Sequence, residues 1–225
     1  MATDHIVKSY DEHITLLTRK ILEMGGLVEQ QIARAVEALV HRDVEQANQV
    51  IEHDDQIDLM EEEIDQYAIR LLATRQPMAV DLRLITMAMK ISNDLERMGD
   101  YATNIANRCE RLAKEPPVKP LYTIPRMAQI SQAMVKDVLD AYVERDTDKA
   151  IAVWRRDDEV DDLFTSLFRE LLTYMMEDAR NISQCIDLIF VAKNLERIGD
   201  HATNIAEKIH YIIHGQRINR MPSSV

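Results

Sequence analysis

The sequence is short of residues that interrupt helices and of residues that form cross-links. It contains only 5 glycines and 6 prolines among 225 residues, and its aromatic content is 5%. The two cysteines, Cys109 and Cys185, are far apart and form no CxxC motif, which argues against a zinc site or a disulfide framework. Because apolar residues make up 46% and charged residues 29%, the composition is typical of a soluble, helix-rich protein.

Basic charge and long apolar runs are scarce as well. The formal net charge of −12 disfavours a nucleic-acid backbone or an anionic membrane leaflet as a direct partner, because both would repel the chain. No apolar run approaches the length of a bilayer span, and Asp4, Lys8, Asp11 and Glu12 stand where a signal peptide would be apolar. We therefore expect a cytoplasmic protein without direct membrane insertion, whose partners are cations or other proteins.

One stretch of twelve residues occurs twice. LERMGDYATNIA, from Leu95 to Ala106, returns as LERIGDHATNIA, from Leu195 to Ala206, with ten identities. A second match relates residues 38–58 to residues 141–161, at a spacing of 103 rather than 100 residues. Repeats in solenoids are usually about 20 to 50 residues long, so this spacing indicates a duplicated domain.

Apolar periodicity predicts three helices in each copy. In the first copy they run from about His5 to Val40, from the capping residue Asp43 to about Thr74, and from roughly Met78 to Ala113. Four of the six prolines lie within ten residues after this third helix, which predicts an extended linker. The expected fold is all-α, with two tandem three-helix bundles at 1–114 and 122–215, a linker at 115–121, and a flexible tail at 216–225 after the helix stop Gly215.

The repeated motif carries a polar stripe almost opposite its apolar stripe. On a wheel of about 100° per residue, Leu95, Met98, Ala102 and Ile105 line one side. The other side carries Glu96, Asp100 and Asn104, with Thr103 beside them, and in the second copy Glu196, Asp200 and Asn204. Like charges one turn apart destabilise a helix by about 0.2–0.5 kcal/mol, and a bound cation reverses that effect. Oxygen ligands of this kind suit hard or borderline metals such as Mg, Mn, Ca or Fe.

Further ligands are expected from the second helix of each copy. Asp54 and Asp58, and in the second copy Asp157 and Asp161, are spaced to look across towards the third helix. Gly99 and Gly199 cost about 1 kcal/mol each in mid-helix, and we expect them to clear space for a bulky group such as an ion cluster or another backbone. The two sites differ, because Phe164 and Phe168 replace Glu61 and Asp65. The alternative interpretation is a solvated helix face without metal.

Enzymatic chemistry is not expected. The chain has no glycine-rich phosphate loop and no spacing typical of a nucleophile. A di-iron enzyme needs Glu-x-x-His on two helices; residues 207–210 supply one such motif, whereas the counterpart 107–110 is Asn-Arg-Cys-Glu. His53, His201 and His210 are expected to be surface or capping residues. An oxygen-ligand metalloenzyme and a metal-free structural helical adaptor remain the alternatives to a regulatory metal-binding protein.

The doubled E-x-x-x-D-x-x-x-N pattern, within two three-helix repeats, resembles the PhoU family over essentially the whole chain. The resemblance implies a non-catalytic negative regulator of the phosphate-starvation response that also modulates phosphate uptake. Its implied partners are the ATPase subunit of the phosphate ABC transporter and a membrane-bound sensor histidine kinase. They would place it in the cytoplasm, peripheral to the inner membrane.

The same resemblance implies metal clusters, often of iron or zinc, on Glu96, Asp100, Asn104, Glu196, Asp200 and Asn204, and it implies a homodimer or higher oligomer. Because the chain is strongly acidic, direct phosphate binding is not expected, and phosphate would be sensed by the transporter.

Overall fold

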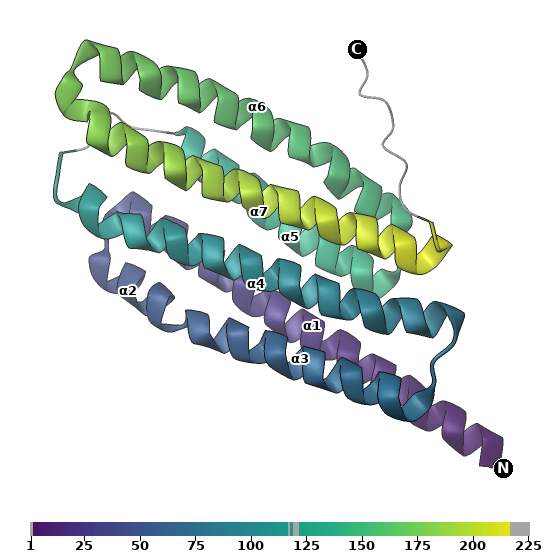
Figure 1. Cartoon of the computed structure of the whole chain (residues 1–225). Coiled ribbons are helices and arrows are strands. Elements are labelled where there is room, and N and C mark those ends of the chain that lie inside the picture. The colour runs from purple at the N-terminus through teal and green to yellow at the C-terminus, as the bar shows by residue number, and fades with distance from the viewer. Residues whose placement is uncertain (1, 117, 119–121, 217–225) are drawn as a thin grey trace.

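The structure is a computed structural model that describes residues 2–116, 118 and 122–216. These residues contain α-helices and one short 3-10 helix, and no strand (Figure 1). The helices are α1 (Ala2–His41), α2 (Val44–Glu52), α3 (Asp54–Arg75), α4 (Ala79–Ala113), α5 (Thr123–Glu144), α6 (Thr147–Glu177), η1 (Ala179–Asn181) and α7 (Ile182–His214). The predicted all-α fold of two three-helix repeats is confirmed.

Helix ends follow the expected local chemistry. The Asp43 carboxylate accepts a hydrogen bond from the Gln46 amide at 3.0 Å, which caps α2. Its counterpart Asp146 accepts from the amides of residues 148 and 149 and caps α6. Gly215, with φ of +69°, ends α7 in the left-handed conformation, as predicted.

The middle helix of the first repeat differs from the prediction of one continuous helix. It is interrupted at His53, where α2 ends and α3 begins. The His53 ring and backbone amide both contact the Gln49 carbonyl, at 2.5 and 3.2 Å. The second repeat has Arg156 at this position, paired with Asp137 at 2.8 Å, and α6 continues without a break.

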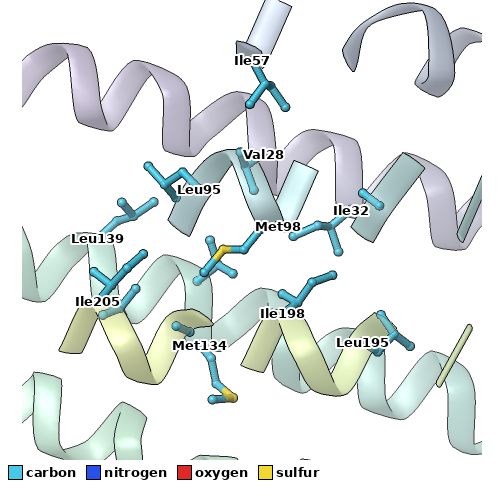
Figure 2. Close-up of a cluster of buried hydrophobic side chains, with 14 of the residues drawn as sticks. Val28, Ile32, Ile57, Leu95, Met98, Met134, Leu139, Leu195, Ile198 and Ile205 are labelled. Atoms are coloured by element: carbon cyan, nitrogen blue, oxygen red, sulfur yellow. The ribbon is translucent and has the colours of Figure 1, made fainter. Parts of the chain in front are cut away.

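The two repeats share one hydrophobic core. The third helices α4 and α7 lie antiparallel at the centre; α1 and α3 pack on α4, and α5 and α6 pack on α7 (Figure 1). Figure 2 shows Leu95 and Met98 of the first repeat in one apolar cluster with Leu195, Ile198 and Ile205 of the second. The apolar stripes of the repeated motif therefore hold the two repeats together, which adds direct packing to the connection expected through the linker.

The proposed boundaries cannot all be placed on the structure. Much of the linker at 115–121 and nearly all of the tail at 216–225 lie outside the described residues, so these domain limits stay predictions. A membrane-spanning helix is not found among the helices of the described residues, since none offers a sufficiently long apolar stretch.

Candidate functional site

The first acidic cluster lies where α3 packs on α4. We define it as Asp54, Asp58, Glu61, Glu96 and Asp100. Burial raises the pKa of Glu96, and the charges of Asp100 and Asp58 raise it further. Burial likewise raises the pKa of Asp58 and of Asp100, with added repulsion from Asp54 in both cases. The structure thus brings the second-helix carboxylates beside the motif carboxylates, in the arrangement that the spacing suggested.

The second acidic cluster occupies the equivalent place between α6 and α7. We define it as Asp157, Asp161, Glu196 and Asp200. Burial raises the pKa of Asp157 to about 7, and Asp161, Asp200 and Glu196 add repulsion. One oxygen of Asp157, Oδ1, is buried without a hydrogen bond in the described part of the chain. Lys193 from α7 forms an ion pair with Glu196 and lies 5.4 Å from the ring centroid of Phe164 on α6.

Arginines of the motif partly balance these charges. In the first cluster, Arg97 lies 3.5 Å from a Glu96 oxygen and 3.3 Å from an Asp100 oxygen. Arg197 instead stands over the Tyr101 ring, 5.6 Å from its centroid. Because these arginines are on the solvent side, the ion pairs of Arg97 are each worth at most about 1 kcal/mol.

The two mid-helix glycines serve a different purpose from the one expected. A Cβ atom on Gly199 would lie 2.7 Å from Asp157 Oδ1, and one on Gly99 would lie 3.0 Å from Ile57 Cδ1. The space beside each glycine is therefore filled by a side chain of the facing helix, and it is not left open for an ion cluster or another backbone. A Cβ atom at either position would require the facing Asp157 or Ile57 side chain to shift.

The asparagines of the predicted triads do not join the carboxylates. Asn104 and Asn204 are exposed, and eight residues at about 100° each turn them roughly 80° away from the glutamates. Asn204 lines a groove of about 320 Å³ between α4 and α7, together with Met87, Lys90, Glu207, Lys208 and Tyr211. The role of Asn104 and Asn204 as metal ligands stays a prediction, and the direction in which they leave their helices does not favour it.

Thr103 is connected to the first cluster in place of Asn104. The amide of Gln31, on α1, donates to Thr103 Oγ1 at 2.8 Å and to Asp54 Oδ1 at 2.9 Å. A residue seven positions after Glu96 lies only about 20° from it on the wheel, so this periodicity could have identified Thr103. The second repeat has Met134 at the position of Gln31, and Asp157 lacks the matching amide donor.

A buried polar network between the motif copies was missed by sequence reasoning. His201 was expected at the surface, yet it is half-buried; its Nδ1 lies 3.0 Å from Asp94 Oδ1 and its Nε2 lies 3.5 Å from the Tyr101 hydroxyl. Lys208 also forms an ion pair with Asp94, whose side chain is 9% exposed. The residues that differ between the two motifs, Tyr101 and His201, thus meet each other across the α4–α7 contact.

The chemistry of the clusters fits a hard cation, although the side chains do not converge on one point. Within the described residues, no three His, Cys, Asp or Glu side chains form a ready metal site. The donors are nevertheless all carboxylates, they repel one another, and a buried Asp157 oxygen lacks a partner. A cation could be held by Asp54, Asp58, Glu96 and Asp100, or by Asp157, Asp161, Glu196 and Asp200.

Comparisons with known proteins agree on one family. The model of the PhoU domain matches residues 21–109 and 124–209. The chain is 50% identical over 217 residues to a phosphate-specific transport system accessory protein PhoU homolog from Caulobacter vibrioides (strain NA1000 / CB15N), covering 96% of this chain and 94% of that one. It is 49% identical to a protein of the same name from Rhizobium meliloti (strain 1021), covering 96% and 91%.

Solved structures show the same relationship. The crystal structure of PhoU from Pseudomonas aeruginosa matches with a TM-score of 0.89 and 43% identity, over 92% of this chain and 100% of that one. The phosphate transport system regulatory protein PhoU from Streptococcus pneumoniae matches with a TM-score of 0.86 and 28% identity, over 93% and 99%. The resemblance seen in the doubled motif is confirmed, and the chain belongs to the PhoU family.

Proposed function

We propose that the chain is an accessory protein of phosphate transport that restrains the phosphate-starvation response. The observation that carries this proposal is the 50% identity over nearly the full length of proteins named as phosphate-specific transport system accessory proteins. In this role the protein couples the ATPase subunit of the phosphate ABC transporter to a sensor histidine kinase. It acts from the cytoplasm, peripheral to the inner membrane through these partners, and it modulates phosphate uptake.

The charge of the chain supports an indirect form of phosphate sensing. A formal net charge of −12, with two acidic clusters on the helix faces, repels phosphate anions. The protein therefore reads phosphate status from the transporter. It passes this information on by changing its contacts with its protein partners. This assigns it signal transduction rather than catalysis.

The acidic clusters are proposed to bind divalent or trivalent cations, among Fe, Zn, Mn and Mg. Asp54, Asp58, Glu96 and Asp100 would link α3 to α4, and the second cluster would link α6 to α7 in the same way. A bound cation would supply positive charge that offsets the mutual repulsion of these carboxylates. The carboxylates would then fix the outer helices against the central pair.

The di-iron alternative receives no specific support. His210 Nδ1 contacts the backbone carbonyl of residue 216 at 3.0 Å, and the His210 ring packs on His214 with centroids 4.5 Å apart. Glu207 lines the α4–α7 groove, away from the carboxylates of the second cluster. The one Glu-x-x-His motif is thus separate from the acidic clusters.

A reporter experiment tests the regulatory proposal. Deleting the gene in phosphate-rich medium is expected to switch on phosphate-starvation promoters, and the parent chain supplied on a plasmid should switch them off. A transporter ATPase mutant measured in parallel shows whether the signal passes through the transporter. Unchanged reporter output in the deletion strain would contradict the assignment.

A further inference from the structure

A pocket of about 300 Å³ lies between the two repeats, at the end of the bundle where α5 and α7 end and α4 begins. Its walls come from α1 and α4 of the first repeat and from α5 and α7 of the second, which contact one another across the boundary between the repeats (Figure 1). We call it the inter-repeat pocket. Its apolar walls include Leu22, Leu84, Ile209, Ile212 and Ile213. Within the described residues, no member of either acidic cluster lines it.

The size and lining of this pocket suit a small organic molecule. Apolar walls with a few polar groups, around roughly 300–1,000 Å³ of space, are typical of small-molecule sites in proteins. A cavity of about 150 Å³ holds one benzene ring, so the inter-repeat pocket has room for roughly ten to twelve heavy atoms. The exposed lining residues Thr15, Arg19 and Val143 mark the side on which a ligand would enter.

One polar side chain of the pocket is buried without a hydrogen-bond partner. Tyr142 is only 6% exposed, and its hydroxyl forms no hydrogen bond of normal geometry within the described residues. Burial raises the pKa of Tyr142 to about 12, and the nearby hydroxyl of Thr18 and the charge of Arg145 lower it in part. Because a buried hydroxyl without a partner is unfavourable, a ligand oxygen that accepts a hydrogen bond from Tyr142 would remove this cost.

A positive charge is available at the mouth of the pocket. Arg145 directly follows α5, lines the pocket and is exposed, and it forms no ion pair within the described residues. The other arginine of the lining, Arg19, is already paired with Glu23 at 2.7 Å. Since a guanidinium group pairs well with a carboxylate, Arg145 can hold the anionic end of a ligand.

The equivalent residues of the first repeat are occupied in another way. Leu39 stands at the position of Tyr142, so the buried hydroxyl has no counterpart there. Arg42 stands at the position of Arg145, and its guanidinium group donates to the backbone carbonyl of Glu115 at 2.6 Å. The combination of a buried hydroxyl and an available arginine is therefore a property of the inter-repeat pocket, and the helical packing does not require it.

We propose that the inter-repeat pocket binds a monocarboxylate with an aliphatic tail, of the size of octanoate. The tail would pack against the leucine and isoleucine side chains of the walls. The carboxylate would accept a hydrogen bond from the Tyr142 hydroxyl and pair with Arg145. One negative charge matches one available arginine, whereas the net charge of −12 would oppose a doubly charged phosphate ester more strongly.

Such a ligand would contact both repeats at once. It would join α1 and α4 to α5 and α7, so its binding would stabilise the contact between the repeats. The pocket is separate from the acidic clusters and does not rest on the proposed regulatory role. Failure of one proposal would therefore leave the other in place.

NMR of protein labelled at the isoleucine Cδ1 methyl groups tests the site directly. Octanoate is expected to shift the signals of Ile209, Ile212 and Ile213, whereas the signals of Ile51 and Ile57, outside the pocket, should stay in place. A dissociation constant on the order of 0.1–1 mM is expected for a ligand of about ten heavy atoms. Acetate, which offers the head group alone, should shift none of these signals at the same concentrations.

Substitutions at the polar end test how the carboxylate is held. Arg145→Gln should raise the octanoate dissociation constant about tenfold, because the paired charge is lost. Tyr142→Phe should raise it about threefold to fivefold, because one hydrogen bond is lost. The matched control Arg42→Gln changes the equivalent arginine of the first repeat and should bind octanoate as the parent does. Binding of 1-octanol, which has no charge, should be the same in Arg145→Gln and in the parent.

A substitution that fills the pocket tests where the tail lies. Leu22→Trp should abolish the shifts, whereas Leu16→Trp, which places the same ring at an exposed position of α1 outside the pocket, should not. Unchanged Ile51 and Ile57 signals show that each variant is folded. Pocket signals of the parent that stay in place at about 10 mM octanoate, tenfold above the weakest expected dissociation constant, would overturn the proposal. Octanoate binding as tight in Leu22→Trp or Arg145→Gln as in the parent would overturn it too.

Discussion

The two acidic clusters descend from one duplicated motif but balance their negative charge in different ways. The first cluster contains Glu61 and receives the Gln31 amide at Asp54. The second has Phe164 in place of Glu61 and Met134 in place of Gln31, and it gains Lys193 where the first repeat has Asn93. The first cluster is thus the larger set of carboxylates. The second cluster is smaller, and the ammonium group of Lys193 already supplies it with a positive charge.

This difference shows how a duplicated site can diverge without loss of the fold. The residues that pack the helices, such as Leu95 and Leu195, are fully buried in both copies. The residues that decide charge lie on the faces between helices, where a substitution leaves the core unchanged. Cation affinity can therefore change in one repeat while the other keeps its properties.

The largest expected effect is the pH dependence that Asp157 creates in metal-free protein. Its carboxyl titrates near pH 4 when unfolded and at about 7 when folded, so the folded state binds more protons between these values. Stability should therefore fall as pH rises through that window, by about 2 kcal/mol after a discount for partial exposure. Urea unfolding in chelator should show that Asp157→Asn removes most of this loss.

The control for this prediction is Asp158→Asn, which neutralises an exposed neighbour on the same helix. It should keep most of the pH dependence of the parent, because Asp158 makes the smallest contribution among the charges that raise the pKa of Asp157. If Asp157→Asn shows the same change of unfolding free energy with pH as the parent and Asp158→Asn, the burial of Asp157 does not govern stability. The two clusters would then not differ in this respect.

A reciprocal exchange at positions 93 and 193 tests the internal cation. Lys193→Asn should raise the affinity of the second cluster for a divalent cation such as Mn²⁺ by roughly five- to tenfold, because the ammonium group no longer competes for Glu196. Asn93→Lys should lower the affinity of the first cluster by a similar factor. Calorimetric titration of both variants measures these changes. Affinities that move in the same direction would show that Lys193 does not act as the competing charge.

A smaller effect is expected from the amide that only the first cluster has. Gln31→Met removes the hydrogen bonds to Asp54 and Thr103 and should cost about 1 kcal/mol of stability. Met134→Gln places an amide beside Gly199, close to Asp157, and should lower the pKa of that carboxyl and recover part of the stability lost at neutral pH. Urea unfolding at about pH 5, inside the window, and at about pH 7.5, above it, separates the two outcomes. A Gln31→Met variant as stable as the parent would remove the role assigned to this amide.

Much of the fold followed from short-range patterns in the sequence. The apolar spacing placed α4 within a residue of its observed limits, and the cap at Asp43 and the stop at Gly215 depend on local chemistry alone. The proximity of Asp54 and Asp58 to the motif carboxylates could also be inferred, because it needs only two adjacent helices.

Other features depend on which side chains meet between distant segments. The break at His53, where the ring contacts the Gln49 carbonyl, is indicated by no periodicity in the sequence. The side chains that fill the space beside Gly99 and Gly199 come from the facing helices, so only the packed structure reveals them. The link between His201 and Asp94 likewise requires knowing that the two motif copies lie antiparallel against each other.

The most direct test of the central claim is metal content measured by elemental analysis after purification without chelator. We expect that the parent carries metal, that Asp100→Ala/Asp200→Ala loses it, and that Asn104→Ala/Asn204→Ala, altered on the same helices but away from the carboxylates, retains it. A parent without metal, or equal metal in the parent and the aspartate variant, would show that the acidic clusters are not cation sites.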